Sequence, residues 1–278
     1  GVLICQDEAE ADAAVKEIML DKKFGASGNR VVVEEFLTGP EVSVLSFCDG
    51  KTLKPMVSSM DHKRALDGDQ GLNTGGMGTV APNPYYTAEV ADRCMKEIFL
   101  PTVEAMQKEG CPFKGCLYFG LMLTPDGPKV IEYNCRFGDP ETQVVLPLLE
   151  SDLLKIMLAT TNGTLDKTEV KFSAGAAACV ILASGGYPLA YEKGKEITGL
   201  VNGQLPGSDA IVYHAGTAVQ DGRLVTAGGR VLGVTATAAD LPAALEKAYA
   251  AADSIHFDKL HRRSDIGARA LAALKARE

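Results

Sequence analysis

The sequence predicts an α+β protein that ends in a small β-rich domain, and two observations support this fold class. In the first half of the chain, segments rich in β-branched and aromatic residues alternate with segments whose apolar residues recur at helical spacing. Beyond Thr164 the composition shifts to short strands separated by glycines, followed by two alanine-rich helices. A length of 278 residues is too long for one small domain.

A helix and several strands are expected first. Asp7 can cap a helix, because Glu10 follows three positions later and apolar residues recur at helical spacing up to Lys22–Lys23. The apolar run Val2–Cys5 ahead of this helix is strand-like. Strands are then predicted over residues 30–37, 42–48 and 52–57, with turns at residues 38–40 and 49–50.

The segment from Asp61 to Pro84 has a different character. Charge, glycine and asparagine dominate it and no period of two or of 3.6 residues survives, which is typical of a long functional loop. The spacing of apolar residues that follows predicts a helix over residues 87–106, kinked at Pro101.

Two more helices are indicated by their caps. In Asp139-Pro140-Glu141 the aspartate stands at the cap and the proline at the first helical position, and Ser151 is expected to cap a helix that ends by Gly163. A domain boundary is placed near residues 164–173. The other strands are expected over residues 115–123, 129–133, 176–183, 210–214, 223–226 and 230–236, and the closing helices over residues 239–252 and 266–276.

Composition excludes several classes of protein. With 28 basic and 36 acidic residues the net charge is −8, which disfavours nucleic acid as a partner. No apolar run approaches the roughly 20 residues of a membrane helix, so no membrane partner is expected. The 7 cysteines include no C-x-x-C pair, which argues against a disulfide framework or a zinc ribbon and favours a reducing, cytoplasmic location. The start at Gly1 is no signal peptide and indicates a chain that begins within a domain.

A candidate adenine site lies around residues 34–41. A strand that runs into an exposed segment leaves backbone groups that can hydrogen-bond the edge of an adenine, and Phe36 and Leu37, next to Glu34 and Glu35, would supply an apolar wall. The Glu41 carboxylate could accept hydrogen bonds from both ribose hydroxyls. The alternative is that these acidic residues are ordinary solvated positions beside a hairpin.

A candidate polyphosphate site combines cations with glycines. Lys63 and Arg64 lie close in sequence to the glycine-rich stretch Asn73–Gly78, where backbone N–H groups could approach phosphate oxygens. The alternative is a surface loop in which the glycines merely turn the chain. His62 could donate a proton or simply hydrogen-bond its neighbours.

The third candidate is a metal site. Glu132 and Asn134 are two residues apart on a predicted strand and share one face, so they present two oxygen ligands side by side. So few oxygen ligands suit Mg²⁺, whose other positions are filled by water and phosphate oxygens, whereas Ca²⁺ takes more. Arg136 is placed to stabilise charge on a transferring phosphoryl group, which makes it the catalytic candidate. A solvated strand end is the alternative.

These motifs, taken in order, resemble the ATP-grasp superfamily and, within it, the glycinamide ribonucleotide synthetase family. The run 136–143, Arg-Phe-Gly-Asp-Pro-Glu-Thr-Gln, is the family's signature. The resemblance implies a partial ATP-grasp fold followed by the β-rich C-terminal domain. It divides the chain into the remainder of the first ATP-grasp subdomain (1–38), the second with the metal site (39–168) and the C-terminal domain (169–278). The matching blocks are residues 34–37, 61–64, 73–78, 132–143, 184–188, 214–217, 228–231 and 263–267.

The resemblance also implies roles for the candidate residues. It makes residues 34–37 the adenine-binding hinge, Glu41 the ribose ligand, Arg64 and Asn73 nucleotide or phosphate contacts, and the 132/134 pair the ligands of Mg²⁺ or Mn²⁺. The family phosphorylates the glycine carboxylate with ATP. The amine of 5-phosphoribosylamine then attacks the glycyl phosphate, giving glycinamide ribonucleotide, ADP and phosphate in de novo purine biosynthesis. Water must be kept out while the acyl phosphate lasts.

Two departures from the pattern leave other interpretations open. Many ATP-grasp enzymes place a second glutamate on the preceding strand, which here reads Tyr118-Phe119-Gly120-Leu121-Met122-Leu123. The family also begins with a Rossmann-like domain and a lysine-bearing glycine-rich segment, so the missing N-terminal segment is an expected partner. The chain alone could therefore be an inactive nucleotide-binding fragment. A third possibility is an ATP-grasp ligase for another small carboxylate.

Overall fold

The computed structural model describes residues 2–277, and the chain divides into two compact units, Gly1–Gly39 and Pro40–Glu278. The regular structure of the first unit is helical. Helix α1 (Glu8–Val15) begins as predicted, because the Asp7 carboxylate accepts a hydrogen bond from the backbone N–H of Glu10 at 2.9 Å. The helix continues through the π-helical turn η1 (Lys16–Leu20), and a 3₁₀ helix, η2 (Gly25–Asn29), follows.

The strand predicted over residues 30–37 is wrong. The described residues of this segment form no strand, and those of the strand-like run 2–5 form none either. Val32 and Val33 are 84% and 85% exposed. Their β-branched composition favours extended backbone, but a strand also needs a partner for its hydrogen-bond ladder, and composition does not supply one.

A four-stranded antiparallel sheet with the order β2-β1-β7-β8 lies at the start of the second unit. The predicted turn at Gly50 is confirmed: the Asp49 carboxylate accepts hydrogen bonds from the N–H groups of Lys51 and Thr52 at 3.0 and 2.7 Å. The predicted strands are confirmed with shifted ends. They are β1 (Glu41–Asp49), β2 (Leu53–Pro55), β7 (Lys114–Thr124) and β8 (Gly127–Asn134).

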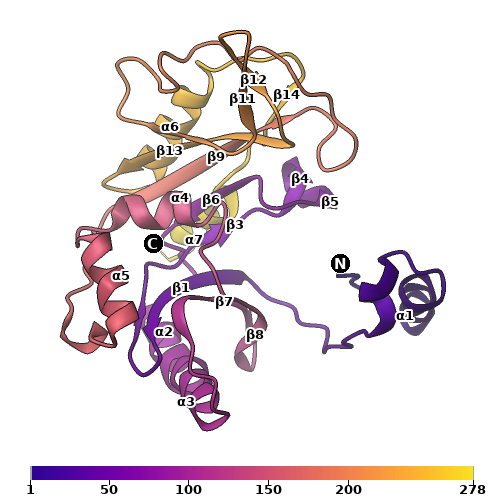
Figure 1. Ribbon diagram of the computed structural model, residues 1–278, viewed down its shortest axis with the longest axis vertical. Coiled ribbons are helices and arrows are strands. Elements are labelled where there is room, and N and C mark those ends of the chain that lie inside the picture. Colours follow the sequence, from indigo (N-terminus) through magenta and orange to yellow (C-terminus); the bar gives the residue numbers. More distant parts are fainter. Residues whose placement is uncertain (1, 278) are drawn as a thin grey trace. The chain divides into compact units, whose positions relative to one another are not determined.

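One face of this sheet is apolar and is covered by a long helical segment (Figure 1). The segment runs through α2 (Ala88–Cys94), the π-helical turn η4 (Met95–Phe99) and α3 (Leu100–Lys108), with Pro101 in the first turn of α3. The rings of Phe99 and Phe119 lie 4.1 Å apart between helix and sheet. The helical segment and this side of the sheet share one apolar core. The opposite face is mixed: Leu45, Phe47 and Cys116 are buried there in another core, and its polar part begins at the start of β1.

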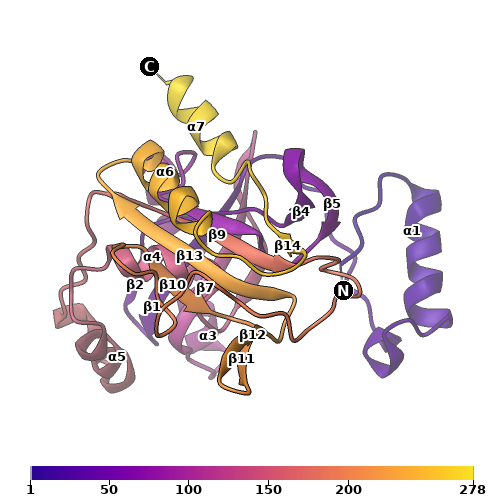
Figure 2. The same cartoon turned by 90° about the horizontal axis from the view of Figure 1, so that it is seen from above.

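A second sheet has the order β10-β13-β9-β6-β3, with β14 also paired to β9. The central strand β9 is buried along its whole length, and helix α6 (Leu241–Ala252) packs on β9 and β13 through small residues (Figure 2). The terminal helix is α7 (Ala268–Lys275). The strands are β3 (Met60–Asp61), β6 (Gly78–Ala81), β9 (Ala176–Ser184), β10 (Ile211–His214), β13 (Arg230–Ala238) and β14 (Leu260–His261).

The single long loop predicted from Asp61 to Pro84 is wrong, because this segment contains paired strands. β3 and β6 join the second sheet, and a small hairpin lies between them, built from β4 (Arg64–Leu66), the 3₁₀ turn η3 (Asp67–Asp69) and β5 (Gln70–Asn73). The ladder partner of β6 is β9, about a hundred residues away, which no local pattern reveals. Another two-stranded hairpin consists of β11 (Thr217–Gln220) and β12 (Arg223–Thr226).

Both helix starts predicted between the sheets need correction. Helix α4 (Thr142–Val145) begins three residues after Asp139, whose carboxylate accepts from the Gln143 side chain at 2.9 Å instead of capping the helix. Helix α5 (Leu153–Asn162) is capped by Asp152, and it ends at Gly163 as predicted. Ser151 instead accepts a hydrogen bond from the backbone of Lys171 at 2.9 Å. The 3₁₀ turns η5 (Leu146–Leu148) and η6 (Leu165–Lys167) follow α4 and α5.

Candidate functional site

The face of the four-stranded sheet that points away from α2 and α3 brings together polar residues from three strands, and we call this part of it the polar face. Directly opposed residues of antiparallel strands point to the same face, and Gly120 stands opposite Ser43 on one side and Glu132 on the other. Tyr118 likewise stands opposite Asn134. Since side chains two apart share a face, Glu41 joins this set. The sequence-predicted ribose and metal candidates therefore lie on one face, opposite the apolar face that packs on α2 and α3.

A shift in the register of β7 and β8 makes this arrangement possible. Gly120 pairs with Glu132 but Leu121 pairs with Val130, so Ile131 is an extra residue in the ladder. Val130 thereby packs against the apolar core, whereas Glu132 turns to the polar face. An irregularity of this kind re-aims side chains and is frequent next to functional sites. Without it, Val130 and Glu132 would share a face.

Glu132 and Asn134 lie side by side as predicted, with Asn134 Nδ2 donating to Glu132 Oε1 at 3.1 Å. Glycine at position 120 leaves the room that Glu132 occupies, because a Cβ there would lie 3.0 Å from Glu132 Cγ. The pair offers a carboxylate and an amide oxygen, which are the hard oxygen donors that Mg²⁺ and Mn²⁺ accept. Among residues 2–277 no cluster of three or more His, Cys, Asp or Glu side chains could hold a metal. The pair therefore fits a metal whose other ligands come from outside the protein.

Lys63 lies beside this face in an ion pair that sequence reasoning did not anticipate. Its Nζ is 3.0 Å from Asp61 Oδ2, and the Asp61 side chain is only 4% exposed. Burial opposes the charged form of Lys63, but Asp61, Tyr118 and Glu141 outweigh it, so its pKa is raised and the ammonium stays charged. For Glu41, burial raises the pKa more strongly than the attraction of Lys63 lowers it.

Glu141 completes this cluster and was missed as a site residue. It is 4% exposed, and its Oε1 accepts a hydrogen bond from Tyr118 Oη at 3.1 Å, which in turn lies 2.7 Å from Ser43 Oγ. Burial, reinforced by repulsion from Asp61, raises the pKa of Glu141 to about 7. The only signal in the sequence was its place in the signature run.

The glycine-rich stretch does not form a phosphate cradle in this structure. Its glycines serve close packing, since a Cβ at Gly76 would lie 2.5 Å from Pro140 Cδ and 2.6 Å from Asp61 Oδ1. The backbone N–H groups of residues 74–77 already donate within the protein. Their acceptors are Lys63 O for Thr74 (2.7 Å), Tyr187 Oη for Gly75 (3.0 Å), Thr74 Oγ1 for Gly76 (2.9 Å) and His62 O for Met77 (2.8 Å).

Arg230, from β13, ties this stretch to the signature run. Its Nη1 donates to the carbonyl oxygens of Gly75 at 2.8 Å and Asp139 at 2.9 Å, and it pairs with the Asp139 carboxylate at 3.3 Å. The C-terminal part of the chain thus fixes two loops beside the candidate site. Arg230 lies in one of the blocks that resemble the family, residues 228–231, but the sequence alone gave no reason to assign it a role.

Of the two interpretations of His62, proton donor or hydrogen-bond partner of its neighbours, the structure shows the second. Its ring is 1% exposed; Nε2 accepts from the Gly267 N–H at 3.0 Å, so Nδ1 carries the proton and donates to Gly78 O at 3.0 Å. Burial lowers its pKa, so the ring is neutral.

The remaining candidates belong to the β4–β5 hairpin, to the segment after β8 and to the first unit. Arg64 and Asn73 are paired across the β4–β5 hairpin, where Arg64 Nη1 donates to Gly71 O at 2.8 Å. Arg136 is exposed and donates to Phe137 O at 2.8 Å. Residues 34–37 belong to the first unit as extended chain, and their adenine-binding role stays a prediction.

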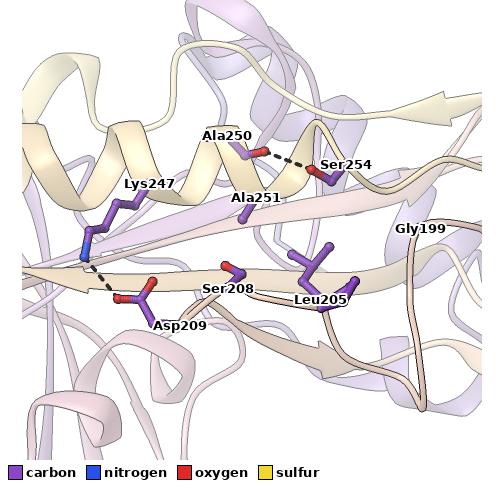
Figure 3. A pocket seen from close by; sticks show the side chains of 9 residues that line it. Gly199, Leu205, Ser208, Asp209, Lys247, Ala250, Ala251 and Ser254 are labelled. Atoms are coloured by element: carbon purple, nitrogen blue, oxygen red, sulfur yellow. Dashed lines mark hydrogen bonds and ion pairs between the residues drawn. The ribbon is translucent and has the colours of Figure 1, made fainter.

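A separate hollow lies between α6 and the loop around residues 199–209 (Figure 3). Its polar groups include an ion pair between Lys247 and Asp209 at 3.1 Å, and Ser254 donates to Ala250 O. None of the candidate site residues lines it, so we do not assign it a role in the chemistry.

Comparison with protein families gives two matches that together cover most of the chain. Residues 1–142 match the phosphoribosylglycinamide synthetase ATP-grasp (A) domain, and residues 177–269 match the phosphoribosylglycinamide synthetase C domain. These matches confirm the expected α+β fold, an ATP-grasp part followed by a smaller C-terminal part.

Individual relatives agree. The chain is 48% identical to a phosphoribosylamine–glycine ligase of Synechocystis over 98% of this chain and 64% of that protein. It is 50% identical to a bifunctional purine biosynthetic protein of Pichia angusta over 97% of this chain and 34% of that protein. The crystal structure of phosphoribosylamine–glycine ligase from Thermotoga maritima matches with a TM-score of 0.84 and 36% identity, covering 95% of this chain and 65% of that one. The chain thus spans about one to two thirds of the length of these relatives.

No helix among the described residues is long and apolar enough to cross a membrane.

Proposed function

Because the chain belongs to the phosphoribosylglycinamide synthetase family, we propose that it carries the catalytic centre of an ATP-dependent ligase that joins glycine to 5-phosphoribosylamine. The observation that carries this proposal is the polar sheet face, which Glu41, Glu132 and Asn134 share and where the charged Lys63 interacts with Glu41 and Tyr118. A carboxylate–amide pair next to a cation suits a metal-bound polyphosphate. The location proposed for this activity is the cytoplasm, in line with seven cysteines that are all free thiols.

The nucleotide is ATP, which the ATP-grasp family match supports. In this proposal the extended segment 34–37 binds the adenine, Glu41 the ribose hydroxyls, and Lys63, Arg64 and Asn73 the phosphates. Lys63 suits this role because its ammonium remains charged while held in place by Asp61. Arg136 is the proposed catalytic residue, since its guanidinium is exposed two residues beyond the end of the strand that carries the metal candidates.

Glu132 and Asn134 would hold Mg²⁺ or Mn²⁺, which would screen the charge of the phosphate oxygens during transfer. The carboxylate and amide oxygens of this pair are donors of the kind that such an ion accepts. The oxygen-only donor set explains why the soft metals bound by cysteine are not expected here.

The reaction follows from the chemistry of a carboxylate. A glycine carboxylate oxygen attacks the γ-phosphorus of ATP, the bond to the β-phosphate oxygen breaks and ADP leaves. The amine of 5-phosphoribosylamine then attacks the acyl carbon, the carbon–oxygen bond to phosphate breaks, and the amine loses one proton. Arg136 and Lys63 stabilise the negative charge that moves during both displacements.

The decisive assay measures ADP release from MgATP by the polypeptide as its gene encodes it, with glycine and 5-phosphoribosylamine both present or one omitted. We expect release that requires glycine, and glycinamide ribonucleotide as the product. Turnover that ignores glycine, or that runs equally well with another small carboxylate, would contradict the substrate assignment. Calorimetric binding of MgATP without any ligation would favour a nucleotide-binding role instead.

A further inference from the structure

The β4–β5 hairpin, residues 64–73, has little core of its own. It is a two-stranded sheet that pairs with no other strand of residues 2–277. Its large apolar side chains Leu66 and Leu72 are 49% and 50% exposed, and the small Ala65 is buried. An isolated two-stranded hairpin is at best marginally stable in water. Contacts from elsewhere must therefore fix the place of Arg64 and Asn73, the two proposed phosphate contacts that it carries.

Those contacts come from one short stretch near the C-terminus, residues 261–269, which we call the C-terminal clamp. Its centre is Arg263, whose side chain is 2% exposed although arginine is rarely buried. Arg263 Nη1 donates to the backbone oxygen of Arg64 at 3.1 Å and to Asp69 Oδ1 at 2.9 Å. Its Nε and Nη2 form a fork with the Asp265 carboxylate at 2.7 and 2.8 Å.

The rest of the clamp continues this pattern. Asp265 Oδ2 also accepts from the Gly68 N–H at 2.8 Å, so the same carboxylate binds both Arg263 and the tip of the hairpin. The N–H of Ser264 donates to Asp67 at 2.8 Å. Arg269 pairs with Asp69 at 3.0 Å, and His261 Nε2 lies 2.7 Å from Ala65 O. Hydrogen bonds from the clamp reach both β4 and the turn of the hairpin.

We propose that Arg263 is a positioning residue of the nucleotide site: through its fork with Asp265 and its bonds to Arg64 and Asp69, it holds in place the β4–β5 hairpin, which carries the two proposed phosphate contacts. The inference rests on the proposed function for the identity of the ligand. The statement that Arg263 holds the hairpin does not depend on the ligand, because it follows from the contacts of Arg263. Arginine is required because one planar fork serves two carboxylates and a carbonyl at once, which a lysine ammonium cannot reproduce.

The first test is hydrogen–deuterium exchange of the backbone amides in residues 64–73 in Arg263→Lys and Asp69→Asn. Asp69→Asn removes the carboxylate charge on the hairpin side and leaves Arg263 paired with Asp265, so it addresses the case in which Arg263→Lys fails to fold. Loss of a charged hydrogen bond should speed exchange in the hairpin by about 10-fold or more, because the hairpin opens more often. Amides of β9 should be unaffected.

The matched control is Arg223→Lys on the β11–β12 hairpin, where Arg223 forms an exposed ion pair with Glu196 at 3.2 Å. It should leave exchange in residues 64–73 and MgATP binding unchanged. Hairpin exchange in Arg263→Lys and Asp69→Asn that equals the wild-type rate would overturn the inference.

The second test is MgATP binding by the same variants, with KM for ATP and kcat where turnover is measured. We expect binding about 10-fold weaker and a raised KM for ATP with kcat largely kept, as for a residue that positions ground-state contacts. Faster exchange with unchanged MgATP affinity would show that the hairpin is not part of the site, and would overturn the positioning role while the proposed function stands. A wild-type chain that binds no MgATP would instead count against the proposed function, and the exchange data would still decide whether Arg263 holds the hairpin.

Discussion

Arg230 Nη1 donates a hydrogen bond to the carbonyl oxygen of Gly75 at 2.8 Å, and this bond joins two segments that lie 155 residues apart. The same nitrogen reaches the carbonyl oxygen of Asp139. One guanidinium from the second sheet therefore fixes the glycine-rich stretch and the signature run to each other.

Replacing Arg230 by lysine should lower the free energy of unfolding by about 1–3 kcal/mol, because a single ammonium cannot keep both carbonyl bonds and the ion pair. Urea unfolding at neutral pH measures the loss. Arg223→Lys is the control, since its ion pair is exposed and should change stability by no more than about 0.5 kcal/mol. Equal stability of the two variants would show that the Arg230 bonds do not hold the two loops.

Gly76→Ala should destabilise the protein by about 2 kcal/mol or more, through strain at a positive φ and a clash with Pro140. Gly76 has φ 116° and its added Cβ would lie 2.5 Å from Pro140 Cδ. Gly222→Ala separates the two causes, because Gly222 also has a positive φ of 77° but has no atom within 4 Å of the added Cβ. Thermal unfolding of both variants should show the larger loss for Gly76→Ala.

Stability should depend on pH through Glu141. Its pKa is raised from 4.5 to about 7 in the folded protein, chiefly by burial and next by Asp61, with Lys63 and Tyr118 acting in the opposite direction. The folded state therefore binds more protons than the unfolded state between these two values. Stability from this group is present at low pH and lost as pH rises through about 7, to an extent on the order of 3 kcal/mol at most.

The measurement is the free energy of unfolding of the wild type and Glu141→Gln at about pH 5, 6, 7 and 8. The glutamine cannot ionise, so the decline across this range should be smaller in the variant. Parallel curves for the two proteins would rule out Glu141 as the titrating group.

Glu132→Gln should weaken MgATP binding by about 10-fold or more, because a neutral amide is a poorer ligand for a hard cation than a carboxylate. Calorimetric titration with Mg²⁺ and with a chelator separates metal-dependent from metal-independent affinity, and only the former should fall. Glu246→Gln, on the exposed face of α6, is the matched control. An unchanged metal-dependent affinity in Glu132→Gln would place the metal elsewhere.

Local patterns predicted the elements that local forces determine. The Asp7 cap, the Asp49–Gly50 turn and the end of α5 at Gly163 were all predicted correctly from a few adjacent residues. The pairing of Glu132 with Asn134 was also correct, because it needs only the alternation of a strand. The order of the motifs along the chain then indicated the family.

Features that depend on distant partners were not predictable. The strand β6 exists because it pairs with β9, and residues 30–37 form no strand although their composition favours one. Glu141 joined the site only because β7 places Tyr118 within hydrogen-bond distance of it. Backbone N–H groups of the glycine-rich stretch donate to Tyr187 Oη and to His62 O, and only the tertiary fold brings these acceptors close.

The second sheet mixes strands from both family matches: β3 and β6 lie within residues 1–142, and β9 and β13 come from the C-domain region. In a chimaera that took only the C domain from a relative, β6 of this chain would have to form its hydrogen bonds with a β9 of different sequence. Recombination between such enzymes should therefore succeed most often when β3, β6 and β9 are inherited together.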